Sequence, residues 1–164
     1  MTQQFADHLY YKKEKHSVRG GLSPFGGIED KDYPVFEVNC SACWRGYIAT
    51  WEIDDEDWLR LVKIKASAMI INDRRIMSEN FLYQVYQGHD SPVTATWVSG
   101  ELEVAYGEVI GSCGQYNPVH ESYKVLRFES GKLIVVNNYD SDWWRKKNDC
   151  ESLENAFNSF LKHS

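Results

Sequence analysis

Long apolar runs and an excess of basic charge are both missing from this sequence. No stretch approaches the roughly 18 apolar residues that a membrane-spanning helix needs, so we expect no membrane partner. The 18 Lys and Arg residues are outnumbered by 24 Asp and Glu residues, which gives a formal net charge of -6. Nucleic-acid binding ordinarily needs a basic footprint that displaces counterions from phosphates. We therefore expect no nucleic-acid partner.

Signatures of catalysis are also lacking. No Gly-x-Ser-x-Gly segment marks a serine nucleophile, and neither Gly20-Gly21 nor Gly26-Gly27 is followed by the Gly-Lys-Ser/Thr of a phosphate loop. A pairing of Cys113 with His120 is conceivable for nucleophilic catalysis, but no third group is identified that would orient the histidine. We therefore expect a protein that is not an enzyme.

Cysteine is scarce, with only Cys40, Cys43, Cys113 and Cys150. The N-terminus has no apolar run after a basic start, so we expect no secretory signal, a cytoplasmic location and reduced thiols. The segment Cys40-Ser41-Ala42-Cys43 is half of a zinc or redox signature, because a structural zinc site usually takes two such pairs. A redox pair would open a helix, whereas this one leads into a predicted strand. Two packed thiols are the favoured interpretation, and we expect no metal and no cofactor.

The chain has 164 residues, a length typical of one domain, so we expect a single domain over residues 1–164. Hydrophobic residues make up 43% of it and aromatic residues 14%, which is enough material for a core. Large aromatic side chains favour half-buried sheets and also dominate interface energetics. Core packing is the favoured interpretation, and an interface is the alternative.

Alternating hydrophobicity predicts a strand from Tyr47 to Ile53, with Ala49 and Trp51 on its apolar face. An acidic turn follows, and a return strand runs from Trp58 to Lys65. The apolar phase of this second strand flips between Leu61 and Val62, which indicates a β-bulge or a strand buried on both faces.

Further elements follow from turn residues and helical periodicity. Two short strands are expected within Leu9–Val18, and hairpins are expected around Ser99-Gly100 and Ser130-Gly131. An internal helix is predicted over Ser78–Gln87, and a C-terminal helix is predicted to begin at Asn148. Together these elements predict an α+β fold: a mainly antiparallel, twisted sheet curled toward a sandwich or half-barrel, with one internal and one C-terminal helix.

The densest acidic cluster is Asp54-Asp55-Glu56-Asp57. It lacks the alternating ligands, the glycine and the distal glutamate of a calcium loop. A solvated turn is one interpretation, and a patch that docks basic groups of a partner is the other. The overall acidity would speed encounter with a basic protein, although mild acidity also simply aids solubility.

Three blocks, in the same order over most of residues 9–135, resemble a family of small intracellular bacterial proteins that has no assigned activity. They are Leu9-Tyr10-Tyr11 through His16-Ser17, Cys43-Trp44-Arg45-Gly46-Tyr47-Ile48-Ala49-Thr50-Trp51-Glu52-Ile53, and Thr96-Trp97-Val98-Ser99-Gly100-Glu101-Leu102. The sequence departs from the family pattern at Gly114-Gln115-Tyr116-Asn117-Pro118, where relatives tend to have a Gly-Tyr-Gly-like stretch. The Trp143-Trp144 tail and the final helix lie outside the resemblance.

Small, acidic bacterial proteins without a catalytic signature often serve as immunity proteins, which is an argument by type rather than by site. We therefore expect a non-enzymatic protein-binding module, in its most specific form an immunity protein that neutralises a toxin domain by stoichiometric binding. Its partner would be a basic protein, and the partner-binding residues would be Asp54, Asp55, Glu56 and Asp57.

The alternative is a small-molecule-binding protein or an enzyme, with a pocket near Trp44, Arg45, Trp97 and Glu101. An arginine can grip a carboxylate or phosphate bidentately, and tryptophan faces can stack on a ring or a cation. For Arg45 and Glu101 themselves, a structural ion pair is the favoured interpretation.

Overall fold

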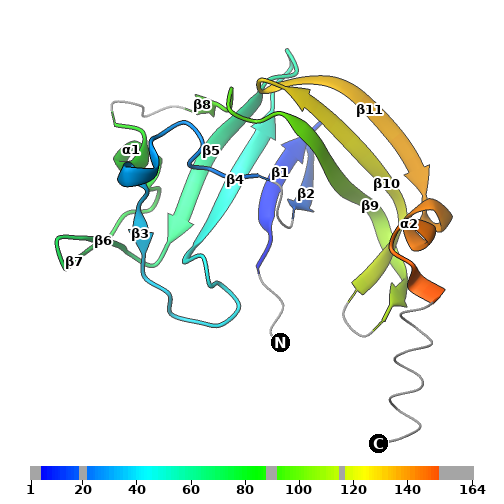
Figure 1. The fold of residues 1–164 in the computed structure, drawn as a ribbon, viewed down its shortest axis with the longest axis horizontal. Coiled ribbons are helices and arrows are strands. Elements are labelled where there is room, and N and C mark those ends of the chain that lie inside the picture. Colours follow the sequence, from blue (N-terminus) through cyan, green and yellow to red (C-terminus); the bar gives the residue numbers. More distant parts are fainter. Residues whose placement is uncertain (1–4, 19–21, 88–91, 115–116, 152–164) are drawn as a thin grey trace, which may run out of the picture. The chain divides into compact units, whose positions relative to one another are not determined.

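The computed structural model describes residues 5–18, 22–87, 92–114 and 117–151 (Figure 1). Within the chain that the sequence predicts as a single domain, contacts gather into two compact units. The first comprises Met1–Leu102 with Arg127–Val135, and the second comprises Glu103–Leu126 with Val136–Ser164. Each unit therefore contains segments that are distant in the sequence.

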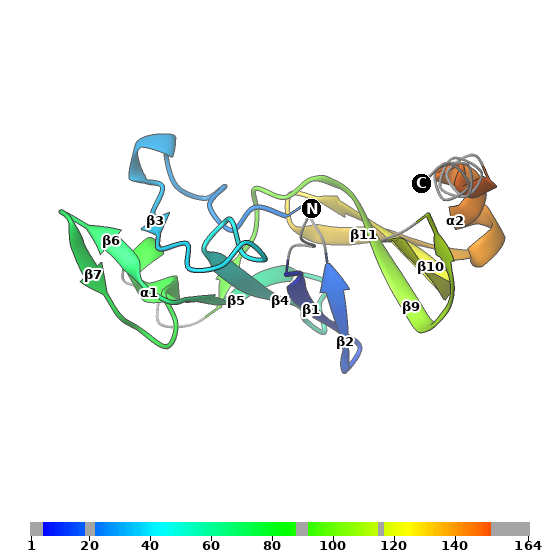
Figure 2. The ribbon, with the colours of Figure 1, turned by 90° about the horizontal axis from the view of Figure 1, so that it is seen from below.

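The first unit is built on a five-stranded sheet with the strand order β2-β1-β4-β5-β8, whose central strands lie side by side in Figures 1 and 2. Its strands are β1 (Asp7–Tyr11), β2 (Glu14–Val18), β4 (Tyr47–Ile53), β5 (Leu59–Ala66) and β8 (Val93–Thr94). Neighbouring strands are antiparallel except for β1 and β4, which are parallel. The two short strands predicted within residues 9–18 are confirmed as β1 and β2.

The hairpin of β4 and β5 contains the predicted bulge. Thr50 pairs with Lys63 and the next residue, Trp51, pairs with Leu61, so Val62 is the extra residue on β5. The bulge returns the apolar phase to the core side, and both Leu61 and Ile64 are fully buried. Of the two causes that the sequence left open, a β-bulge or a strand buried on both faces, the structure shows the bulge.

One face of this sheet is buried in the core of the first unit. Its largest fully buried side chains include Leu9, Trp51, Leu59, Leu61, Ile64 and Phe81. Burying one such side chain contributes roughly 1.5–3 kcal/mol, so these six stabilise the sheet substantially against the entropy lost on folding.

A smaller sheet, in the order β3-β6-β7, belongs to the same unit. Its strands are β3 (Val35–Phe36), β6 (Met69–Ile71) and β7 (Arg74–Ile76), and a 3-10 turn, η1 (Asp30–Asp32), precedes β3. Both strand pairs are antiparallel.

The internal helix is shorter than the sequence predicts. We expected Ser78–Gln87 with Ser78 as the cap, but helix α1 spans only Leu82–Val85. The side-chain oxygen of Asn80 accepts hydrogen bonds from the backbone N–H groups of Leu82 and Ile64 (2.9 and 3.0 Å), so Asn80 joins the start of the helix to β5. Because an asparagine side chain that bonds to nearby backbone competes with helical hydrogen bonds, the helix begins at Leu82 and not at Ser78.

The third sheet has the order β11-β10-β9, and each of its strands contributes to both units. The strands are β9 (Gly100–Cys113), β10 (Asn117–Glu129) and β11 (Lys132–Asp140). The hairpin around Ser130-Gly131 is confirmed, and both residues have positive φ angles, 48° and 85°, as a tight type I′ turn requires. The prediction of a hairpin around Ser99-Gly100 is wrong, because Val93 and Thr94 pair with β5 instead of with β9.

The second unit ends the described chain with helix α2 (Ser141–Lys147). The Asp140 side chain caps it by accepting from the N–H of Trp143, and three basic residues occupy its last turn, where the helix dipole favours cations. Asn148 is the C-cap of this helix, so its predicted role as an N-cap is wrong. Most of the predicted C-terminal helix, residues 152–164, lies outside the described residues.

The fold class is α+β, rich in strands and mainly antiparallel, as the sequence predicts. In the part of the chain that the structure describes, no helix is long and apolar enough to cross a membrane.

Candidate functional site

The acidic turn between β4 and β5 is a rigid hairpin tip. The Asp54 carboxylate accepts hydrogen bonds from the N–H groups of Glu56 and Trp58, both at 2.9 Å, and lies 3.5 Å from the guanidinium of Arg60. The Asp57 N–H donates to the Asp54 carbonyl (3.0 Å), and Asp57 adopts a left-handed φ of 67°. Asp54 therefore has a structural role within its own turn.

The β10–β11 turn fixes the same tip from a distant part of the sequence. The Leu133 N–H donates to the carbonyl of Asp57 and the Leu59 N–H donates to the carbonyl of Gly131, both at 2.8 Å. The Lys132 ammonium donates to the Glu56 carbonyl and stacks over the Trp58 ring, 4.8 Å from its centroid. These contacts hold the tip backbone in one conformation.

The remaining three carboxylates of the cluster point into solvent. Asp55, Glu56 and Asp57 are exposed, whereas Asp54 is partly buried. We name Asp55–Asp57 the acidic tip. A hollow of about 540 Å³ lies beside it, and its lining combines Asp54 and Asp55 with Lys12 and Lys13.

The Arg45 side chain is held by a different carboxylate from the one that the sequence suggested. Its guanidinium donates two hydrogen bonds to Asp7, at 2.8 and 3.1 Å, and lies over the ring of Tyr47. Asp7 is only 2% exposed and also accepts from the Ala49 N–H at 2.9 Å. The predicted structural role of Arg45 in an ion pair agrees with this geometry, but its partner is Asp7 and not Glu101.

The other residues of the candidate ligand pocket have separate environments. Trp44 is 70% exposed, and Glu101 is exposed at the start of β9. The Trp97 indole N–H donates to the Ser23 carbonyl (2.8 Å), and its ring stacks on Tyr86 with centroids 5.7 Å apart. The contacts described for Arg45 and Trp97 therefore go to different residues, Asp7 and Tyr47 for Arg45 and Ser23 and Tyr86 for Trp97.

Tyr86 ties the Trp97 ring to a glycine loop. Its hydroxyl donates to the Pro24 carbonyl (2.7 Å) and accepts from the Gly27 N–H (3.3 Å). Burial raises the pKa of Tyr86 to about 12, although the hydrogen bond from Gly27 acts in the opposite direction. A side chain in place of Gly26 or Gly27 would overlap the Trp97 ring, so this cluster is a packing unit.

The cysteines differ from the prediction. Cys40 and Cys43 are free, as expected, but Cys40 is exposed, so the interpretation of two packed thiols is wrong for it. Cys113 and Cys150 form a disulfide at a sequence separation of 37. The prediction that all four thiols are reduced is therefore wrong for this pair, and a Cys113 thiolate paired with His120 is excluded in this oxidised form. The cause is spatial: the end of β9 and the turn after α2 meet inside the second unit.

We predict that the purified protein holds no stoichiometric zinc. A structural zinc site takes four ligands, and with Cys113 and Cys150 joined to each other only two free thiols remain. Elemental analysis of the purified chain checks this. One zinc per chain that disappears when Cys40 or Cys43 is replaced would contradict the prediction.

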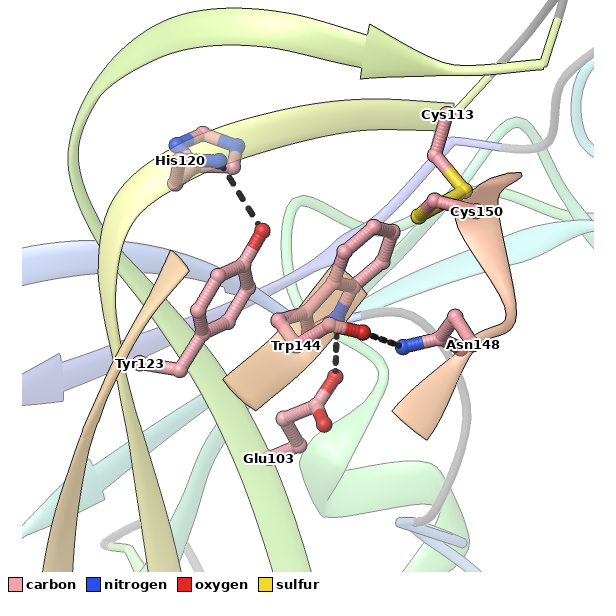
Figure 3. The surroundings of a disulfide bond; sticks show 7 residues. All are labelled: Glu103, Cys113, His120, Tyr123, Trp144, Asn148 and Cys150. Atoms are coloured by element: carbon pink, nitrogen blue, oxygen red, sulfur yellow. Dashed lines mark hydrogen bonds between the residues drawn. A yellow bond between two sulfur atoms is a disulfide. The ribbon is translucent and has the colours of Figure 1, made fainter. Parts of the chain in front are cut away.

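Trp144 packs against the disulfide, and Tyr123 lies beyond it (Figure 3). The Trp144 ring stacks on Tyr123 with centroids 5.3 Å apart, and its indole N–H donates to Glu103 at 3.1 Å. The Tyr123 hydroxyl accepts a hydrogen bond from the backbone N–H of His120 at 2.9 Å. Burial raises the pKa of Tyr123. Sequence reasoning missed this cluster, because Trp143-Trp144 carries no periodic signal and the disulfide joins distant segments.

Comparison of the chain with family models, with curated proteins and with solved structures finds no match.

Proposed function

We propose that this protein is a non-enzymatic protein-binding module, and in its most specific form an immunity protein that neutralises a basic toxin domain by stoichiometric binding. The observation that supports the proposal is the acidic tip. Its three exposed carboxylates stand on a backbone that hydrogen bonds already fix on both sides. A preorganised charged surface loses little conformational entropy on binding and steers an oppositely charged partner.

We propose that the protein acts in the cytoplasm. We also propose that its sheets curl toward a sandwich or half-barrel. Nuclease-like toxins attract phosphates and are basic around their substrate site. An inhibitor that covers such a site needs about 800 Å² of its own surface, of which the acidic tip would be the charged centre.

The alternative function, a ligand pocket near Trp44, Arg45, Trp97 and Glu101, draws less support from the contacts described. The Arg45 guanidinium already grips the Asp7 carboxylate, which is the bond that a ligand carboxylate or phosphate would need. Ligand binding there would require this ion pair to open.

We predict that removing the charge of the acidic tip slows binding and leaves folding intact. The variant is Asp55→Asn/Glu56→Gln/Asp57→Asn, which keeps the Asp54 cap and places asparagine at the left-handed position 57. Association with a basic toxin domain should slow by about tenfold at low salt and lose most of its salt dependence. The unfolding free energy should change by less than about 0.5 kcal/mol.

The measurement is stopped-flow association at two salt concentrations. The partner to use is the C-terminal domain of a large exported protein, if the neighbouring gene encodes one. The matched control is Glu29→Gln/Asp30→Asn/Asp32→Asn, which removes three exposed carboxylates around η1. An association rate that falls equally in both variants would show that net charge alone matters. An unchanged rate in the tip variant would exclude the tip as the docking site.

A further inference from the structure

The outer face of the five-stranded sheet, opposite the core residues Leu9 and Trp51, collects basic side chains. Because side chains alternate along a strand, the residues next to these buried ones point to the other face. The register places His8 beside Ser17 and Thr50, Thr50 beside Lys63, and Tyr10 beside Lys15. We name as the basic face Lys15 and Ser17 on β2, His8 on β1, Thr50 on β4, and Lys63 and Lys65 on β5.

The lysines of the basic face are not neutralised by direct ion pairs. In the described residues, Lys15, Lys63 and Lys65 form no ion pair. Glu52 is the one carboxylate among the strand residues on this side, and it is flanked in register by Tyr10 and Arg60. A chain of net charge -6 therefore keeps a positive surface on one side of this sheet.

His8 lies within this positive field. The pKa of His8 is lowered, and burial is the largest cause. Lys15 and Lys65 also lower this pKa, whereas Asp7, the neighbouring residue on β1, raises it. Lys15 belongs to β2 and Lys65 to β5, so the histidine is flanked by lysines from both sides of its strand. Its Nδ1 atom is buried and has no hydrogen-bond partner in the described part of the chain.

We propose that the basic face binds an extended acidic segment of a polypeptide. Residues two apart on a strand lie about 6.6–7 Å apart on one face, and this is the spacing of Lys63 and Lys65. Alternate carboxylates of an extended peptide have the same spacing, so two of them can pair with these two lysines. The hydroxyls of Ser17 and Thr50 supply hydrogen-bonding groups between the flanking lysines.

The same face fits a nucleic acid poorly. Single strands bind proteins through several stacked rings along a basic groove. Tyr10, 43% exposed, is the one tyrosine, phenylalanine or tryptophan among the β1, β2, β4 and β5 residues that point to this side.

This inference is independent of the proposed function, because the acidic tip selects a basic surface and the basic face selects an acidic one. The test is fluorescence anisotropy with the full chain and a labelled ten-residue peptide of alternating Glu and Thr. The variant is Lys15→Gln/Lys63→Gln/Lys65→Gln. We expect it to bind the peptide at least about tenfold more weakly than the unchanged chain at low salt.

The matched control is Lys31→Gln/Lys146→Gln/Lys147→Gln, which removes the same charge from exposed positions elsewhere and should bind within about twofold of the unchanged chain. Equal weakening in both variants, or no binding of the peptide by the unchanged chain, would overturn the proposal. Tighter binding of a ten-nucleotide single strand than of the peptide, lost in the same variant, would also overturn it and assign the face to nucleic acid.

Discussion

Replacing Arg45 by alanine is expected to lower the unfolding free energy by about 3 kcal/mol. The loss comes mainly from Asp7, a carboxylate that is 2% exposed and would keep only its hydrogen bond from the Ala49 N–H. Removing one partner of a buried ion pair typically costs about 3–5 kcal/mol, and the lower end applies because the Arg45 side chain is 33% exposed. Urea unfolding followed by tryptophan fluorescence measures this change.

The matched control is Arg75→Ala. Arg75 and Glu37 form an ion pair of similar length, 2.7 Å against 2.8 Å for Arg45 and Asp7, but the Arg75 side chain is 58% exposed. An exposed pair contributes at most about 1 kcal/mol. Equal losses in the two variants would show that burial of Asp7 is not what makes the Arg45 pair important.

Loss of the Cys113–Cys150 disulfide is expected to destabilise the second unit by about 4 kcal/mol. A cross-link between two cysteines that are 37 positions apart in the sequence removes conformational entropy from the unfolded chain. Cys113 and Cys150 are both buried, and Trp144 packs against them, so its fluorescence should report the change. The measurement is unfolding of Cys113→Ser/Cys150→Ser beside the unchanged chain.

The control for this variant is Cys40→Ser/Cys43→Ser, which replaces two free thiols and should change stability by less than about 1 kcal/mol. Identical unfolding of the Cys113→Ser/Cys150→Ser variant and the unchanged chain would contradict the predicted contribution of the disulfide. Disulfides persist mainly in oxidising compartments. Counting free thiols in protein taken from cells therefore also tests the cytoplasmic location: two per chain would speak against it, and four would support it.

Local signals predicted part of this fold well. The alternation in Tyr47–Ile53, the phase flip at Val62 and the turn at Ser130-Gly131 depend on neighbouring residues, and the structure confirms all three. The hairpin at Ser99-Gly100 failed because β8 has a distant partner, β5, for which its own residues give no sign. The length of the helix predicted at residues 78–87 was overestimated, because the Asn80 side chain bonds to β5 and the helix does not extend back to include it.

The site was less predictable than the fold. The sequence located the acidic cluster but could not separate Asp54, which caps the turn, from the three exposed carboxylates. It placed Arg45 in an ion pair but named the wrong partner, because 38 residues separate Arg45 from Asp7. Pairings at this distance depend on strand order, which composition and periodicity do not contain.

The bonds between the acidic tip and the β10–β11 turn also have a consequence for biosynthesis. The Lys132 ammonium reaches back 76 residues to the carbonyl of Glu56, and Leu133 reaches back in the same way to Asp57. A nascent chain that ended before residue 130 would contain all four acidic residues but none of these bonds. The acidic tip therefore acquires its final support only after most of the chain has left the ribosome. A truncated product would display the same charges on a turn that is held only by its own bonds to Asp54.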